Sequence, residues 1–249
     1  MSPRCIPELL AVLLLAGCSV KEDRNSCPCV LEVDLSLFSA LTGGGQLSLD
    51  GTSEFQFNQG SEVEEISTFK GSHRICVAGG SGYSISADKA LVQKYGEGEL
   101  FSFHESVLCE GERQTVTAIP RKEFTSVILN IDEDDSGSMV KIASDYNGLL
   151  LNDSSPLKGQ LKFTPEKIGP GLYRFRLPRQ GVDNSLSILY SQDGNSSVFL
   201  PLNKWVADAG FDWEAPDLAD INIGAEHSFS SISLSITDWQ TGMTANVTL

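Results

Sequence analysis

The 249-residue chain is strongly acidic, because its 33 Asp and Glu residues outnumber 18 Lys and Arg and give a formal net charge of −15. This balance excludes a nucleic-acid-binding protein, since phosphate recognition requires a basic surface. With 41% hydrophobic residues the chain can bury a substantial core. Its length fits one large domain or two medium domains, and we expect two.

The N-terminal segment has the pattern of a bacterial lipoprotein signal peptide. The apolar run Leu9–Ala16 is shorter than the roughly 20 residues that a membrane span needs, but it suits a signal-peptide core. Leu15–Cys18 reads Leu-Ala-Gly-Cys, in which small residues precede the thiol that lipid transfer requires. We expect residues 1–17 to be removed and Cys18 to carry membrane-binding acyl chains. A buried N-terminal helix is the alternative, since only Arg4 is basic before the apolar run.

A polar tether is expected over residues 18–28, because Ser19–Ser26 shows no hydrophobic periodicity. Its Lys21–Asp23 segment resembles the lysine-plus-acidic export signal of surface lipoproteins in Bacteroidetes, which implies a position outside the outer membrane. The mean hydropathy of −0.07 favours no further membrane span.

Short strands separated by Gly, Asn and Ser turns dominate the next segment, and we assign residues 29–131 to a first β-sandwich. One short helix of one or two turns is expected over residues 87–95. The expected strands are residues 31–37, 46–50, 54–58, 74–78, 83–87, 99–103, 114–119 and 124–131.

An acidic, Gly-containing break over residues 132–138 predicts the domain boundary. A second β-sandwich is then expected over residues 139–249, with one short helix over residues 203–209 and a hairpin turn at residues 192–195. The expected strands are residues 139–144, 159–163, 171–177, 185–190, 197–200, 221–224 and 230–237. The fold class predicted is therefore all-β, with two antiparallel β-sandwiches in tandem.

The C-terminus carries an alternating apolar pattern that predicts a last strand. Its apolar residues are Met243, Ala245, Val247 and Leu249. One interpretation is an ordinary strand that pairs within its own domain. The alternative is a donor strand that completes the sheet of a neighbouring molecule, with backbone hydrogen bonds and alternate side chains supplying the affinity.

Six cysteines are present, of which Cys5 leaves with the signal peptide and Cys18 is acylated. The four that remain are Cys27, Cys29, Cys76 and Cys109. In an extracytoplasmic compartment we expect a structural disulfide, either Cys76 to Cys109 or one of these joined to Cys27 or Cys29. A metal site at Cys27-Pro28-Cys29 is disfavoured, because no His-rich segment lies nearby.

No catalytic, metal or cofactor site is predicted, and a small-molecule ligand is not expected. The segment around Ser81 lacks the last glycine of a nucleophile elbow. The acidic break matches the start of a calcium loop, but Ala143 stands where a bidentate Glu is needed. The histidines His73, His104 and His227 are dispersed without metal-ligand spacing. Trp205, Trp213 and Trp239 could stack on sugars, although core positions are the more common role.

The order of several short segments resembles the FimB/Mfa2-type fimbrial anchor family of Bacteroidales and the related fimbrillin-like cell-adhesion proteins. The segments follow the lipoprotein signal and tether and are Cys27–Cys29, Gly98–Phe101, Ile119–Arg121, Asn147–Leu149, Val198–Trp205 and Ile236–Trp239. The resemblance implies two transthyretin-like β-sandwiches, an outer-membrane lipid anchor and a part in fimbriae that assemble by strand exchange.

In such families an arginine-directed protease releases the first strand of shaft subunits and opens a groove. Here Arg24 precedes the first strand, and no basic residue follows it before Lys70. The resemblance therefore implies an anchor whose groove stays filled. We expect a non-catalytic surface lipoprotein that anchors or forms part of a fimbria, with outer-membrane lipid (through Cys18) and fimbrial subunits as partners. The alternative is a carbohydrate-binding surface lipoprotein of a glycan-uptake system.

Overall fold

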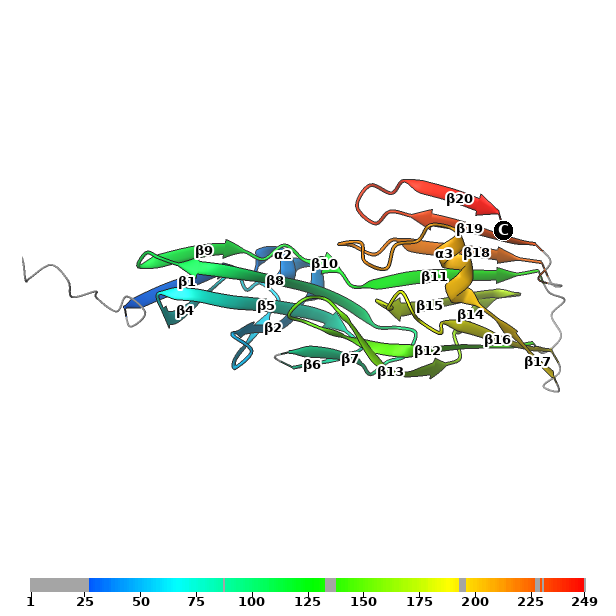
Figure 1. Cartoon of the computed structure of the whole chain (residues 1–249), viewed down its shortest axis with the longest axis horizontal. Coiled ribbons are helices and arrows are strands. Elements are labelled where there is room, and N and C mark those ends of the chain that lie inside the picture. Colours follow the sequence, from blue (N-terminus) through cyan, green and yellow to red (C-terminus); the bar gives the residue numbers. More distant parts are fainter. Residues whose placement is uncertain are drawn as a thin grey trace, which may run out of the picture.

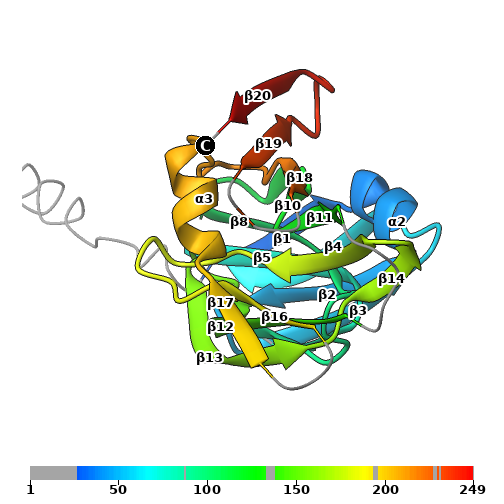
Figure 2. The same cartoon turned by 90° about the vertical axis from the view of Figure 1, so that its right-hand side faces the viewer.

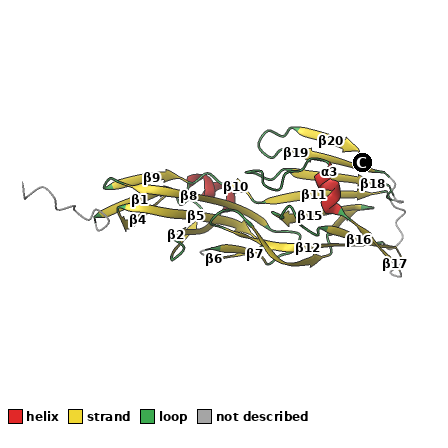
Figure 3. Cartoon of the chain, viewed as in Figure 1, coloured by secondary structure: helices red, strands yellow, loops and turns green. Residues whose placement is uncertain are grey.

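The computed structural model describes residues 27–86, 88–132, 138–192, 196–226, 229 and 231–248. The molecule is elongated, with the first strand at one end and the C-terminal half of the chain at the other (Figure 1). Strands dominate, and the described helices are α2 (Ser36–Thr42) and α3 (Leu202–Asp208) (Figure 3). The expected all-β class is confirmed. Neither helix is long and apolar enough to cross a membrane.

The first sandwich pairs a three-stranded sheet with a five-stranded sheet. The small sheet is β4 (Val63–Phe69), β1 (Pro28–Asp34) and β9 (Arg113–Thr117), in that order. The large sheet is β10 (Arg121–Lys122), β8 (Glu99–Cys109), β5 (Gly71–Ser81), β2 (Gly44–Leu49) and β3 (Ser53–Asn58). Alternate residues of β1, including Leu31 and Val33, are buried in the core between the sheets, as the period of two predicts.

The second sandwich packs two six-stranded sheets around a larger core. One sheet is β14 (Glu166–Gly169), β15 (Leu172–Pro178), β11 (Phe124–Ile131), β18 (Asp220–Ala225), β19 (Ile232–Thr237) and β20 (Thr244–Thr248). The other is β17 (Ser196–Leu200), β16 (Ser187–Gln192), β12 (Met139–Leu150), β7 (Lys89–Val92) and β6 (Tyr83–Ser86), with β13 (Pro156–Phe163) also paired to β12.

The expected domain boundary at residues 132–138 is wrong. β11 was assigned to the first sandwich, but it pairs with β15 and β18 in the second. The chain passes between the sandwiches just before β11, at residues 118–123. The acidic break instead connects β11 to β12, which lie in opposite sheets of the same sandwich, and residues 133–137 of it lie outside the described part. The hairpin of β6 and β7, which lies between β5 and β8 in the chain, also belongs to the second sandwich.

Two local expectations are also wrong. Residues 36–42 form α2 instead of extending the first strand, because the Asp34 carboxylate accepts a hydrogen bond from the Ser36 amide at 3.0 Å and turns the chain. Gly43, with φ of 72°, then ends the helix. Residues 89–92 form β7 where a short helix was expected, and the acidic strand β4 was not expected.

The second helix, α3, lies within one residue of the expected range. Its buried residues Leu202, Trp205 and Val206 pack into the core of the second sandwich. Figure 2 shows α3 along one side of that sandwich.

Buried charges join the two sandwiches. Glu123, between β10 and β11, is fully buried and accepts hydrogen bonds from Arg179 Nε at 2.6 Å and Ser102 Oγ at 2.5 Å. Next to it, the buried Lys122 donates to Asp220 Oδ1 at 2.5 Å and to the Leu218 carbonyl at 3.1 Å. Because both charges are paired and hydrogen-bonded, their burial is tolerated and fixes the junction.

Candidate functional site

The C-terminal strand β20 forms a free edge of the second sandwich. It pairs antiparallel with β19, with Ala245 opposite Ile236 and Val247 opposite Leu234. Met243 is 73% exposed, Ala245 is exposed and Val247 is half-buried, while Leu249 lies outside the described residues. The alternating apolar residues of this strand are therefore only slightly buried in the structure.

A shallow hollow lies beside β20. It measures about 320 Å³, and its lining combines apolar residues with three carboxylates. The apolar residues include Phe211, Ala219, Ile236, Met243 and Ala245, and the carboxylates are Asp212, Asp217 and Asp238. Two residues of the expected donor strand thus border a hollow, and the core of their own sandwich does not enclose them.

The turn between β19 and β20 leans toward the first sandwich. Asp238 Oδ1 accepts hydrogen bonds from the amide and hydroxyl of Thr241, at 2.6 and 2.7 Å. These hydrogen bonds lower the pKa of Asp238. Trp239 packs on Phe101 of β8, with ring centroids 5.9 Å apart, and Gln240 donates to Asp217 at 2.6 Å. Sequence reasoning quoted Trp239 and the segment Ile236–Trp239 but predicted no turn there, although Asp and Gly are both residue types that favour turns.

The first strand, β1, occupies the centre of its sheet. All seven of its residues are in register with β4, and Val30–Asp34 is also paired in parallel with β9. Leu31 and Val33 are fully buried. On the outer face Arg113 pairs with Glu32 and with Glu65 and links the three strands. The place between β4 and β9 is therefore filled by the chain's own strand.

The favoured Cys76 to Cys109 disulfide is contradicted by the strand register. Cys76 lies opposite His104, whereas Cys109 lies opposite Gly71, five positions farther along β5. That separation is about 17 Å along the strand, far beyond the reach of a disulfide. Cys109 instead shares a core with Cys29. Burial, followed by the hydrogen bond with Cys29, raises the pKa of Cys109 to about 11.

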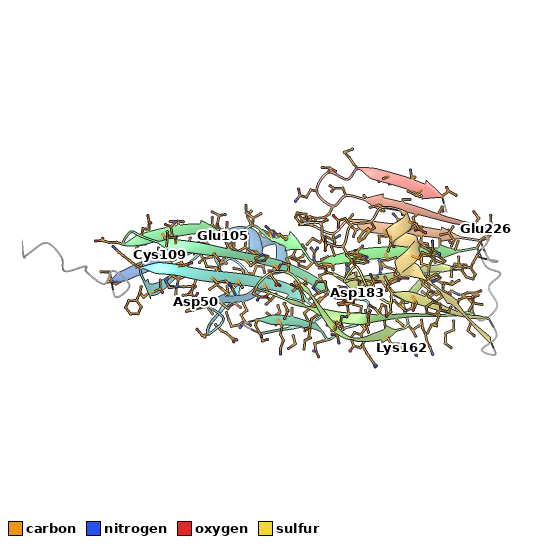
Figure 4. The ribbon with its side chains drawn as sticks, viewed as in Figure 1. Asp50, Glu105, Cys109, Lys162, Asp183 and Glu226 are labelled. Atoms are coloured by element: carbon orange, nitrogen blue, oxygen red, sulfur yellow. The ribbon has the colours of Figure 1, made fainter. Side chains whose placement is uncertain are left out.

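All four described cysteines are free thiols in the structure. Figure 4 labels Cys109 close to the end of the molecule where β1 begins. The alternatives that involve Cys27 or Cys29 therefore remain as predictions.

The tryptophans do not gather on one face. Trp205 and Trp213 are 8% and 6% exposed and belong to the core of the second sandwich, whereas Trp239 is 37% exposed at the junction. Among the described residues no group of His, Cys, Asp and Glu has the arrangement of a metal site.

The histidines are separate as well. His73 Nδ1 is 2.8 Å from Asp50 Oδ2, and His73 Nε2 is 2.7 Å from the Phe69 carbonyl. Burial opposes protonation of His73, but the hydrogen bonds to Asp50 and Phe69 outweigh it, so the pKa of His73 is raised. His104 lies at the junction of the sandwiches, and His227 and Cys18 lie outside the described residues.

The comparisons with known proteins identify the fold. No family model matches the chain, and no curated protein does either. A candidate polysaccharide-binding protein from Bacteroides thetaiotaomicron is similar in structure, with a TM-score of 0.65 and 14% identity over 88% of this chain and 98% of that one. The fimbrial anchor protein Mfa2 from Porphyromonas gingivalis has a TM-score of 0.60 and 12% identity over 88% and 99%.

A candidate adhesin from Bacteroides ovatus gives a TM-score of 0.58 and 11% identity over 92% of this chain and 97% of that chain. The chain thus has the fold of Bacteroidales adhesin-like proteins and of a fimbrial anchor, and the resemblance noted in the sequence is confirmed at the level of fold.

Proposed function

We propose that this chain is a non-catalytic surface lipoprotein that anchors or forms part of a fimbria. In this proposal acylated Cys18 holds it on the outer membrane, and β20 joins it to a fimbrial subunit. The observation that carries the proposal is the free edge formed by β20, at which Met243 and Ala245 are exposed. The shared fold with a fimbrial anchor supports it.

The composition of β20 favours strand donation. Natural edge strands are commonly protected from pairing by charged residues, Pro or bulges. Residues 243–248 contain no charged residue and no Pro, and they alternate Met, Ala and Val with Thr and Asn. Such a strand can add to a partner's sheet through its backbone while alternate side chains enter pockets.

The position of β1 favours an anchor over a processed shaft subunit. β1 is paired on both sides and supplies fully buried residues to the core. Releasing it would expose this apolar surface. The absence of a basic residue between β1 and Lys70 gives an arginine-directed protease no cleavage point after the strand.

The two ends of the molecule suit separate attachments. β1 begins at one end of the long axis, and the sheet that carries β20 lies toward the other end (Figure 1). A lipid on Cys18 would lie nine residues before Cys27, so the tether would place β1 nearest the membrane and β20 away from it.

The experiment compares two test variants, each with its own control, in the native bacterium. Cys18→Ala is expected to release the protein from outer-membrane fractions, because the acylated thiol is lost, whereas Cys27→Ala is the control and stays bound. Truncation after Gly242 is expected to leave the protein on the membrane but to abolish co-purification of fimbrial subunits.

Phe199→Ser, on the exposed edge strand β17, is the matched control for the truncation and should retain those subunits. Membrane retention of Cys18→Ala contradicts the anchor. Unchanged subunit recovery after truncation contradicts strand donation and favours the ordinary-strand interpretation.

The second candidate is a carbohydrate-binding lipoprotein of a glycan-uptake system. The similar Bacteroides thetaiotaomicron protein, described as a candidate polysaccharide-binding protein, supports it. The sequence suggested that three tryptophans stack on sugars. Because Trp205 and Trp213 are buried, they do not form such a binding face. Exposed tryptophans would be quenched by acrylamide, and we expect weak quenching of these two.

A further inference from the structure

A cavity of about 470 Å³ lies where the two sandwiches meet. It is lined by His104, Arg121 and Glu123, by the turn at residues 153–156 between β12 and β13, and by the segments 179–183 and 213–216. Asp183, labelled in Figure 4, marks this region near the middle of the molecule. The volume falls within the range of small-ligand pockets, which is about 300–1,000 Å³.

The buried Glu123 fixes the floor of this cavity. Besides Arg179 and Ser102, its carboxylate accepts a hydrogen bond from Ser154 Oγ at 2.8 Å. Arg179 in turn donates to the carbonyls of Trp213 and Ala215, at 2.6 and 2.8 Å. One ion pair therefore holds three of the wall segments, and the cavity is formed before any ligand arrives.

The turn after β12 has a conformation that most residues avoid. Ser154 has a φ of 57°, in the left-handed region that favours glycine. Its hydroxyl is held by Glu123, and the adjacent Asp153 Oδ1 accepts a hydrogen bond from the Ser155 amide at 2.9 Å. Strained residues of this kind persist where their surroundings hold them, and they are concentrated at functional sites. Here the turn leaves the Asp153 carboxylate exposed at the mouth.

The mouth of the cavity presents hydrogen-bond donors and hydrogen-bond acceptors side by side. Arg121 is exposed, so its guanidinium is available to a ligand. His104 is half-buried, with Nδ1 3.4 Å from Ser154 Oγ. Burial, and then the nearby Arg121, lower the pKa of His104, so its ring is neutral at pH 7 and can both donate and accept.

The charges around the cavity indicate the class of ligand. Four carboxylates and two guanidiniums line it, so a small anion meets an excess of negative charge. Two neighbouring hydroxyl groups on a neutral ligand, in contrast, can donate a hydrogen bond to Asp153 and accept one from Arg121. We propose that this cavity binds a neutral sugar of one or two units. The site uses none of β20 or Cys18, so it is independent of the fimbrial role, and it gives a location to the second candidate function, carbohydrate binding, on which it rests.

The test measures binding of glucose, galactose, mannose and N-acetylglucosamine to the full chain, purified in detergent, by saturation-transfer NMR and calorimetry. We expect at least one of these sugars to bind. Arg121→Gln and Asp153→Asn should each weaken that binding about tenfold or more, because each loses a hydrogen bond to a charged group. Both residues are exposed, so both variants should fold.

Arg174→Gln is the matched control, since Arg174 is an exposed arginine on β15 outside the cavity and should leave binding unchanged. Three outcomes overturn the proposal: none of the four sugars binds, binding is undiminished in both mouth variants, or the acidic sugars glucuronate and N-acetylneuraminate, measured alongside, bind and the four neutral sugars do not. The last outcome would assign the cavity to an anion.

Discussion

Cys29 and Cys109 bring two buried thiols together from opposite sheets of the first sandwich. Cys29 belongs to β1 and Cys109 ends β8, so a covalent bond between them would tie the first strand to the larger sheet. The sequence left several cysteine pairings open, because spacing along the chain does not reveal which strands face each other. Strand register rules out a bond between Cys76 and Cys109, and Cys76 packs in a different core cluster from Cys29 and Cys109.

We predict that an oxidised sample contains a Cys29 to Cys109 disulfide. Closing a loop of this length typically stabilises a protein by about 2–4 kcal/mol, so reduction should lower the free energy of unfolding by that amount. Intact-mass and peptide analysis under non-reducing conditions checks the bond, and denaturant unfolding with and without reductant checks its effect.

Cys76→Ser is the control and should keep both the bond and the response to reductant. Recovery of free thiols at Cys29 and Cys109 after exposure to an oxidising glutathione buffer would show that the pair does not close.

At the scale of elements, local patterns predicted strands well but not their partners. β11 spans the residues expected, because Val127, Leu129 and Ile131 alternate clearly. Its parallel partner β18 begins almost ninety residues later, and no local pattern records that pairing. The acidic strand β4 was not predicted, because Ile66 is its one buried apolar residue and its other positions are polar or exposed.

We predict that β20 opens more readily than β1. β20 has one partner strand in the described part of the chain and is mostly exposed, whereas β1 is paired on both sides and buried. Local opening needs less free energy where few apolar contacts are lost. Hydrogen exchange followed by mass spectrometry should therefore label residues 244–248 well before residues 28–34.

The edge strand β14, in the same sheet as β20, is the internal reference for solvent-exposed edges. Equal protection of β20 and β1 would contradict the weak attachment that strand donation requires.

At the scale of the whole molecule, the junction depends on residues that no local sequence pattern connects. Glu123 and Arg179 are 56 residues apart, with Glu123 between β10 and β11 and Arg179 directly after β15. The fold makes them partners, and the cavity above them follows from the same pairing. This is why sequence reasoning found neither the junction nor a ligand site.

We predict that Glu123→Gln destabilises the protein by about 3–5 kcal/mol, because it leaves the buried Arg179 without its carboxylate. Denaturant unfolding measures the loss. Glu166→Gln removes the exposed partner of Arg174 and should cost at most about 1 kcal/mol. Similar losses in the two variants would show that the buried pair does not hold the sandwiches together.

The orientation of β1 determines how the molecule would carry mechanical load. The strand runs along the long axis and begins at the outer end of the molecule (Figure 1). A pull on the tether therefore acts lengthwise on β1, and its hydrogen bonds to β4 and β9 bear the force together, in shear. A strand pulled sideways would instead open one bond after another, like a zipper. The fold thus presents its most resistant direction to a force that enters at the N-terminal end.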